Sequence, residues 1–75
     1  MAELPAVPGG QVIRALEKVG FVAVRRESSH VMMKRPGHPY VLTVVVHGSQ
    51  CMSTGTLRSI IRHAGLTVEQ FRELL

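Results

Sequence analysis

Several residue types are missing or scarce in this chain, and each absence excludes a class of protein. Among its 75 residues there is no Trp and no Asp, and Cys51 is the only cysteine. A lone cysteine cannot form an intrachain disulfide, which excludes a secreted scaffold held together by disulfides. The lack of Asp excludes a Ser/His/Asp triad. The longest apolar run, around residues 44–46, falls far short of the ~20 residues that span a bilayer. No signal peptide precedes it, so we expect a cytoplasmic protein with no membrane partner.

An excess of positive charge is the main feature of the composition. The chain has 9 Lys and Arg against 5 Glu, a formal net charge of +4 and a sequence pI near 10.3. Pairing of Lys and Arg with phosphates releases counterions, which gives a basic protein affinity for nucleic acid. A basic surface that only maintains solubility is the alternative. A chain of this length forms one domain that buries roughly 60% of the surface its unfolded form exposes.

The first half of the chain predicts a helix followed by three strands. Residues 1–9, with two prolines, are interpreted as a flexible leader. The helical spacing of Val12, Leu16 and Val19 and the following Gly20 predict a helix over 10–19. Runs of β-branched and aromatic residues, separated by short connections, predict three antiparallel strands. These strands are expected at residues 21–27, 30–35 and 40–47, with a Pro- and Gly-rich turn at 36–39.

The second half predicts two more helices. Ser53 or Thr54 can cap a helix whose apolar stripe consists of Leu57, Ile60, Ile61 and Ala64, and Gly65 is expected to end it. Thr67 and Gln70 form a capping-box pattern for a short last helix, in which Phe71, Leu74 and Leu75 are expected to point inward. Together these elements predict an α+β fold of type α-β-β-β-α with a short C-terminal helix added. The helices would lie on one face of the sheet, as in double-stranded RNA-binding domains, within a single domain spanning 10–75.

The four histidines are the residues best suited to chemistry. None has the spacing of a metal-binding pair, so no metal or other cofactor is expected. His30 begins the second strand, where alternation puts it on the same face as Met32 and Lys34. An imidazole exchanges protons near neutral pH, and RNA carries its own nucleophile in the 2′-OH. His30 is therefore a candidate general acid or base, with an ordinary exposed strand histidine as the alternative.

Basic residues near this position predict contacts with RNA phosphates. Lys34 and Arg35 form a basic pair at the end of the second strand. Arg58 and Arg62 lie one turn apart on the second helix, where like charges repel slightly unless an anion binds them. A solvated face is the alternative for Arg58 and Arg62. Glu27, close to His30, is a candidate for orienting the imidazole.

Four segments together resemble the HicA family of toxins, which are messenger-RNA interferases of toxin–antitoxin modules. They are LEKVGF at 16–21, SSH at 28–30, VVVHG at 44–48 and GTLRSIIRHAGLTVEQF at 55–71. The resemblance covers residues 10–75 and implies a fold like a double-stranded RNA-binding domain, metal-independent cleavage of mRNA, and neutralisation by a HicB-type antitoxin. The family's catalytic histidine falls on His30, preceded by Ser29, and the second histidine of its motif falls on His47, to which we assign a supporting role.

One departure from the family pattern concerns the turn before His30. Ser28 stands where the family usually has Gly, and a serine there would strain the turn if the position requires a positive φ. Two other functions stay open on the sequence alone. The chain could bind structured RNA without cutting it, or it could be a protein-interaction domain whose basic face receives an acidic partner.

Overall fold

Three antiparallel strands and three helices make up the fold in the computed structural model, which describes residues 4–75. The order along the chain is α1 (Gly9–Glu17), β1 (Val22–Glu27), β2 (His30–Lys34), β3 (Leu42–Val45), α2 (Thr54–His63) and α3 (Val68–Glu73). The strands lie in the order β1-β2-β3, so β2 is the central strand and the other two are edges. The predicted α+β topology is confirmed.

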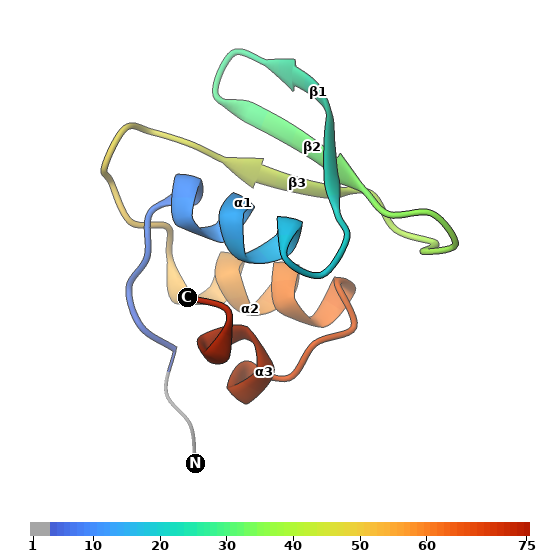
Figure 1. The fold of residues 1–75 in the computed structure, drawn as a ribbon. Coiled ribbons are helices and arrows are strands. Elements are labelled where there is room, and N and C mark those ends of the chain that lie inside the picture. Colours follow the sequence, from blue (N-terminus) through green and yellow to red (C-terminus); the bar gives the residue numbers. More distant parts are fainter. Residues whose placement is uncertain (1–3) are drawn as a thin grey trace.

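The helices cover one face of the sheet and leave the other face open (Figure 1). Val31 and Met33 of β2 and Val44 of β3 are completely buried on the covered face. They pack against apolar residues of the helices and of the segment before β1, chiefly Val12, Leu16, Phe21, Leu57, Ile61 and Phe71. Burial of these side chains is the main force that holds the helices to the sheet, at about 1.5–3 kcal/mol for each large side chain. On the open face, His30, Lys34 and Thr43 are exposed.

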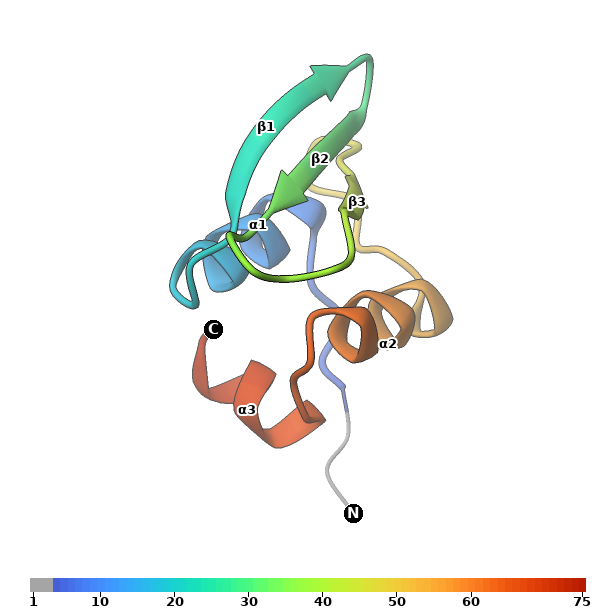
Figure 2. The same cartoon turned by 90° about the vertical axis from the view of Figure 1, so that its right-hand side faces the viewer.

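The β1–β2 hairpin extends beyond the helix layer, as Figure 2 shows. All six residues of β1 are exposed, since no helix covers this edge of the sheet. The hairpin turn consists of Ser28 and Ser29, and only Ser28 has a positive φ, of 53°. A positive φ at the first of two turn residues is the type II′ pattern, a position that favours Gly. Further along, an extra residue forms a bulge between Ala23 and Arg25.

The helix ends follow the capping signals in the sequence. The Ser53 hydroxyl accepts a hydrogen bond from the Thr56 amide at the start of α2, and Thr67 with Gln70 forms the complete capping box of α3. Gly20 and Gly65 have φ values of 98° and 80° just after α1 and α2. No helix in the described part of the chain is long and apolar enough to cross a membrane.

Several expected boundaries were wrong by one or two residues. Helix α1 ends at Glu17, because residues 18–20 turn toward β1, and β2 ends before Arg35. Strand β3 covers only 42–45 of the expected 40–47, because its pairing with β2 runs only from Leu42, opposite Met33, to Val45, opposite His30. Leu75 was expected to point inward, but it follows the last turn of α3 and is 47% exposed.

Part of the expected leader packs on the domain. Residues 1–3 lie outside the described part of the chain. Val7 is buried, its carbonyl accepts a hydrogen bond from the Met52 amide, and Pro8 forms a β-bridge with Cys51. Gly9 already belongs to α1 and is buried. The packed domain therefore begins before residue 10.

Candidate active site

His30 lies at the first position of β2, directly after the hairpin turn. Its cross-strand partners are Glu27 on β1 and Val45 on β3. Because Val31 is buried on the helix side, alternation directs the His30 side chain to the open face of the sheet. The ring is exposed, and within residues 4–75 it takes part in no hydrogen bond or ion pair. It is therefore free to meet a ligand that approaches this face.

The charged groups nearest to His30 come from β1. Glu27 faces His30 across the ladder, but its carboxylate pairs with the guanidinium of Arg25. Both side chains are more than half exposed, so the pair contributes little to stability. The Glu27 carboxylate is accordingly held by Arg25 rather than by the imidazole, in contrast to the orienting role considered for it from the sequence.

Arg25 is a cation of this surface that the predicted site did not include. It lies opposite Met32, diagonal to His30 on the same face, where cross-strand neighbours are about 7–8 Å apart. A two-residue turn at 28–29 pairs Glu27 with His30 and Arg25 with Met32. The sequence therefore already contained the signal that places Arg25 near His30. Lys34 shares the open face, but it lies four residues from His30, about 13 Å along the strand.

Arg35 points away from the open face and is held within the protein. Its guanidinium donates to the carbonyl of Val19 at 3.2 Å and to Nδ1 of His38 at 3.2 Å. It also lies over the ring of Phe21, 4.8 Å from its centroid. These contacts join the loop after β2 to the end of α1. The guanidinium predicted to bind RNA thus has protein partners on three sides.

Arg58 and Arg62 lie on the far side of α2 from the sheet. With Leu66, Thr67 and Val68 they line a hollow between α2 and α3. Both side chains are exposed. Since α2 belongs to the layer that covers the sheet, these arginines and His30 face opposite directions. The structure therefore places Lys34 on the open face and Arg58 and Arg62 on the opposite surface, whereas Arg35 belongs to neither.

Ser29 and His47 lie close to the turn that carries His30. The amide of Val46 donates to the carbonyl of Ser29 at 2.8 Å, which extends the pairing of β2 and β3 by one residue. His47 follows this bond and is exposed beside the hairpin turn. Ser29 is half-buried and contributes its backbone to the ladder. Both residues are thus placed to shape the surroundings of His30.

The site as a whole is an exposed imidazole on an open, shallow sheet face with one arginine nearby. Such a surface can receive an extended or helical polyanion, because no wall limits the size of the ligand. A single imidazole can take or give one proton. Chemistry at this site therefore depends on a substrate that brings its own nucleophile.

Comparisons with known proteins agree with this fold. The sequence profile of the family described as "HicA toxin of bacterial toxin-antitoxin" matches residues 9–66. A chain from a solved structure, the "Toxin-Antitoxin complex from Streptococcus pneumoniae", superposes with a TM-score of 0.63 and 25% sequence identity. The superposition covers 83% of the present chain and 100% of that chain. No curated protein matches.

Proposed function

Because the chain belongs to the HicA toxin family of toxin–antitoxin systems, we propose that it is a metal-independent endoribonuclease that cleaves mRNA with His30. The observation that carries this proposal is the open position of His30. A proton-transferring side chain is exposed on an uncovered sheet face, without any hydrogen bond in the described chain that would hold it. An antitoxin of the HicB type would block this activity.

The chemistry follows from what one imidazole can supply. RNA attacks its own backbone when the 2′-oxygen bonds to the adjacent phosphorus and the bond from phosphorus to the 5′-oxygen breaks. His30 takes the proton from the 2′-OH or gives one to the departing 5′-oxygen. The products are a 2′,3′-cyclic phosphate and a 5′-hydroxyl. One such proton transfer contributes about 10²- to 10⁴-fold, which suits a substrate with an internal nucleophile.

Electrostatic contacts hold the RNA on the open face. Arg25 and Lys34 are the cations on this face. A phosphate that binds Arg25 would compete with Glu27 for the guanidinium and release the carboxylate close to the imidazole. Arg58 and Arg62 would act as a second contact zone, reached only by RNA that extends around the domain. Ser29 and His47 support the position of the hairpin turn.

Replacement of His30 by Gln tests this proposal. Gln is polar and similar in size but cannot transfer a proton, so RNA cleavage and growth arrest should fall by about 10²- to 10⁴-fold. His30 is exposed, so the free energy of unfolding should change by no more than about 0.5 kcal/mol. Thr43→Ala, an exposed change on the same face, is the control and should keep the parent activity. A His30→Gln variant as toxic as the parent would contradict the proposal.

RNA binding without cleavage is the second candidate, and two observations favour it. Ser28, two residues before His30, holds a positive φ, and Arg25, which lies diagonal to His30 on the open face, is already paired with Glu27. Incubation of the purified protein with RNA and a metal chelator distinguishes the two functions. Cleaved RNA supports the ribonuclease, whereas retarded but intact RNA supports the binding module.

A further inference from the structure

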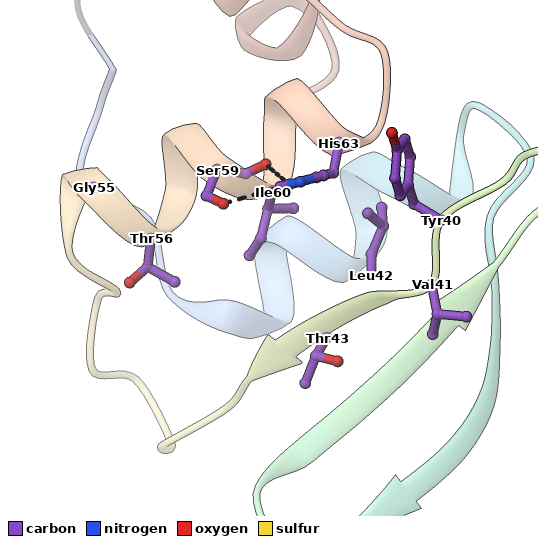
Figure 3. Close-up of a pocket in the computed structure, with 9 residues that line it drawn as sticks. All are labelled: Tyr40, Val41, Leu42, Thr43, Gly55, Thr56, Ser59, Ile60 and His63. Carbon is purple, nitrogen blue, oxygen red and sulfur yellow. Dashed lines mark hydrogen bonds between the residues drawn. The ribbon is translucent and has the colours of Figure 1, made fainter.

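A groove runs along the free edge of β3 and separates it from α2 (Figure 3). Its volume is about 580 Å³. Leu42 and Ile60 form the floor, and Tyr40 and His63 close one end. Apart from Ile60 and His63, the part of α2 that lines the groove has only the small residues Gly55, Thr56 and Ser59, so α2 leaves open the space beside the strand.

The backbone of β3 presents unpaired groups to this groove. The Val46 amide donates a hydrogen bond to the Ser29 carbonyl. Along an antiparallel edge strand, residues that bond to the neighbouring strand alternate with residues that do not, so this bond identifies which residues of β3 bond to β2. Val44 and Leu42 therefore bond to β2, while the N–H and C=O of Thr43 and Val45 point to the free edge. The start of α1 covers the carbonyl of Val45, where Gly9 makes a close contact. Within residues 4–75, Thr43 is left with a free donor and a free acceptor.

The two edges of the sheet differ in how well they resist pairing with another chain. The β1 edge carries a bulge and the charged residues Arg25, Arg26 and Glu27, which are features that discourage strand addition. Strand β3 has neither a charged side chain, nor a proline, nor a bulge. Tyr40 and Val41, just before β3, are 53% and 51% exposed beside the groove. Only this edge is open to strand addition.

The charge of the groove favours a polypeptide over a nucleic acid. None of the nine Lys and Arg residues of the chain lines it. A phosphate backbone would find no cation here, although cations dominate protein–nucleic acid affinity. An uncharged floor, a wall of small side chains and a free N–H and C=O are instead the features to which an extended main chain binds by strand addition.

We infer that this groove is a docking site for an extended segment of the antitoxin, which adds to the sheet as a fourth strand at Thr43. The inference rests on the proposed function only in naming the antitoxin as the partner. Side chains of the added segment that face the helices would be small or β-branched, to fit between Leu42 and Ile60. The His63 ring donates from Nδ1 to the Ser59 carbonyl at 2.8 Å, which leaves Nε2 as a hydrogen-bond acceptor at the closed end.

Amide hydrogen exchange of Thr43 tests the inference directly. The experiment compares the full-length protein alone with its complex with the antitoxin encoded by the adjacent reading frame. Exchange at the Thr43 amide should slow by about tenfold or more in the complex, because strand addition bonds this group. The amide of Arg26 is the control. It faces the free edge of β1, since the two-residue turn pairs Glu27 with His30, and its exchange should not change.

Two variants provide a second readout of the same interface. Thr43→Pro removes the free donor without affecting the bonds to β2, and Ser59→Arg fills the groove from the helix wall. Each should raise the Kd for the antitoxin by about tenfold or more, equivalent to about 1.4 kcal/mol. Arg26→Pro places the same change at the β1 edge and should alter the Kd by less than about twofold. Thermal unfolding of each variant confirms that it folds.

The outcomes separate this inference from the proposed ribonuclease. Protection of Thr43 by the antitoxin supports the docking site even if the free protein fails to cut RNA. An antitoxin that binds without protecting Thr43, or that does not bind, overturns the docking site and leaves the ribonuclease to its own test. Protection of Thr43 by an RNA oligonucleotide instead of the antitoxin also overturns it and assigns the groove to nucleic acid.

Discussion

The guanidinium of Arg35 and the ring of His38 are joined by a hydrogen bond that determines the tautomer of the histidine. Arginine can only donate, so Nδ1 of His38 accepts, and the proton of the ring lies on Nε2. Nε2 then donates to the carbonyl of His63 at the end of α2, 2.6 Å away. The His38 ring also meets Phe21 and Tyr40 edge to face. Arg35 and His38 together connect the loop between β2 and β3 to α1 and α2.

Arg35→Ala should destabilise the protein rather than mainly weaken RNA binding. The change removes two hydrogen bonds and the contact with Phe21, and it leaves His38 without its donor. We expect a loss of about 1–3 kcal/mol in the free energy of unfolding, measured by urea denaturation. Lys34→Ala is the matched control, because Lys34 is exposed and is expected to affect only RNA affinity and its salt dependence. Equal stability of the two variants would refute the structural role of Arg35.

Ser28→Gly should stabilise the hairpin that carries His30. Ser28 has a φ of 53°, a conformation that Gly adopts without strain. We expect a gain of up to about 1 kcal/mol in the free energy of unfolding, reduced by the greater entropy of Gly in the unfolded chain. Ser29→Gly is the control, since Ser29 does not share the positive φ, and it should be neutral or destabilising. A destabilised Ser28→Gly protein would mean that the serine turn carries no strain.

Gly9→Ala should be among the most damaging single-methyl changes in this chain. A Cβ at this position would collide with the carbonyl of Val45 and crowd the side chain of Val46, and backbone cannot move aside as a flexible side chain does. We expect a loss of about 1–3 kcal/mol, measured by thermal or urea unfolding. Gly10→Ala, one residue further, meets open space and should stabilise α1 by up to about 1 kcal/mol. Similar effects of the two changes would contradict the close packing of α1 on β3.

Phe71→Ala should cost about 3–5 kcal/mol, although the residue lies beyond the part of the chain that matches the family profile. Its side chain is completely buried, and α3 depends on it for packing against the rest of the core. Leu75→Ala removes an apolar side chain from the same end of the chain, but it is largely exposed and should cost less than about 0.5 kcal/mol. The difference is measurable by urea denaturation. A Phe71→Ala protein as stable as the parent would show that α3 does not contribute to the core.

The elements and their order can be predicted from the amino-acid sequence, because the responsible signals are local. Helical spacing of apolar residues, β-branched runs, the capping box at Thr67 and Gln70, and the glycines after α1 and α2 all act within a few residues. The hairpin turn at 28–29 also determined which residues face His30, so Glu27 and Arg25 were within reach of a prediction. The position of His30 on the same face as Met32 and Lys34 required only strand alternation.

The roles of the charged side chains and of the strand edges depend instead on how the helices and strands pack together. Arg35 follows a strand and looks like one more surface cation, but the approach of Phe21, Val19 and His38 turns it inward. Arg58 and Arg62 looked like partners of His30 until the packing of Leu57 and Ile61 against the sheet directed them to the opposite side. The groove at Thr43 likewise depends on where α2 lies relative to β3. Contacts between residues distant in sequence depend on how whole elements pack, and neither composition nor spacing encodes that geometry.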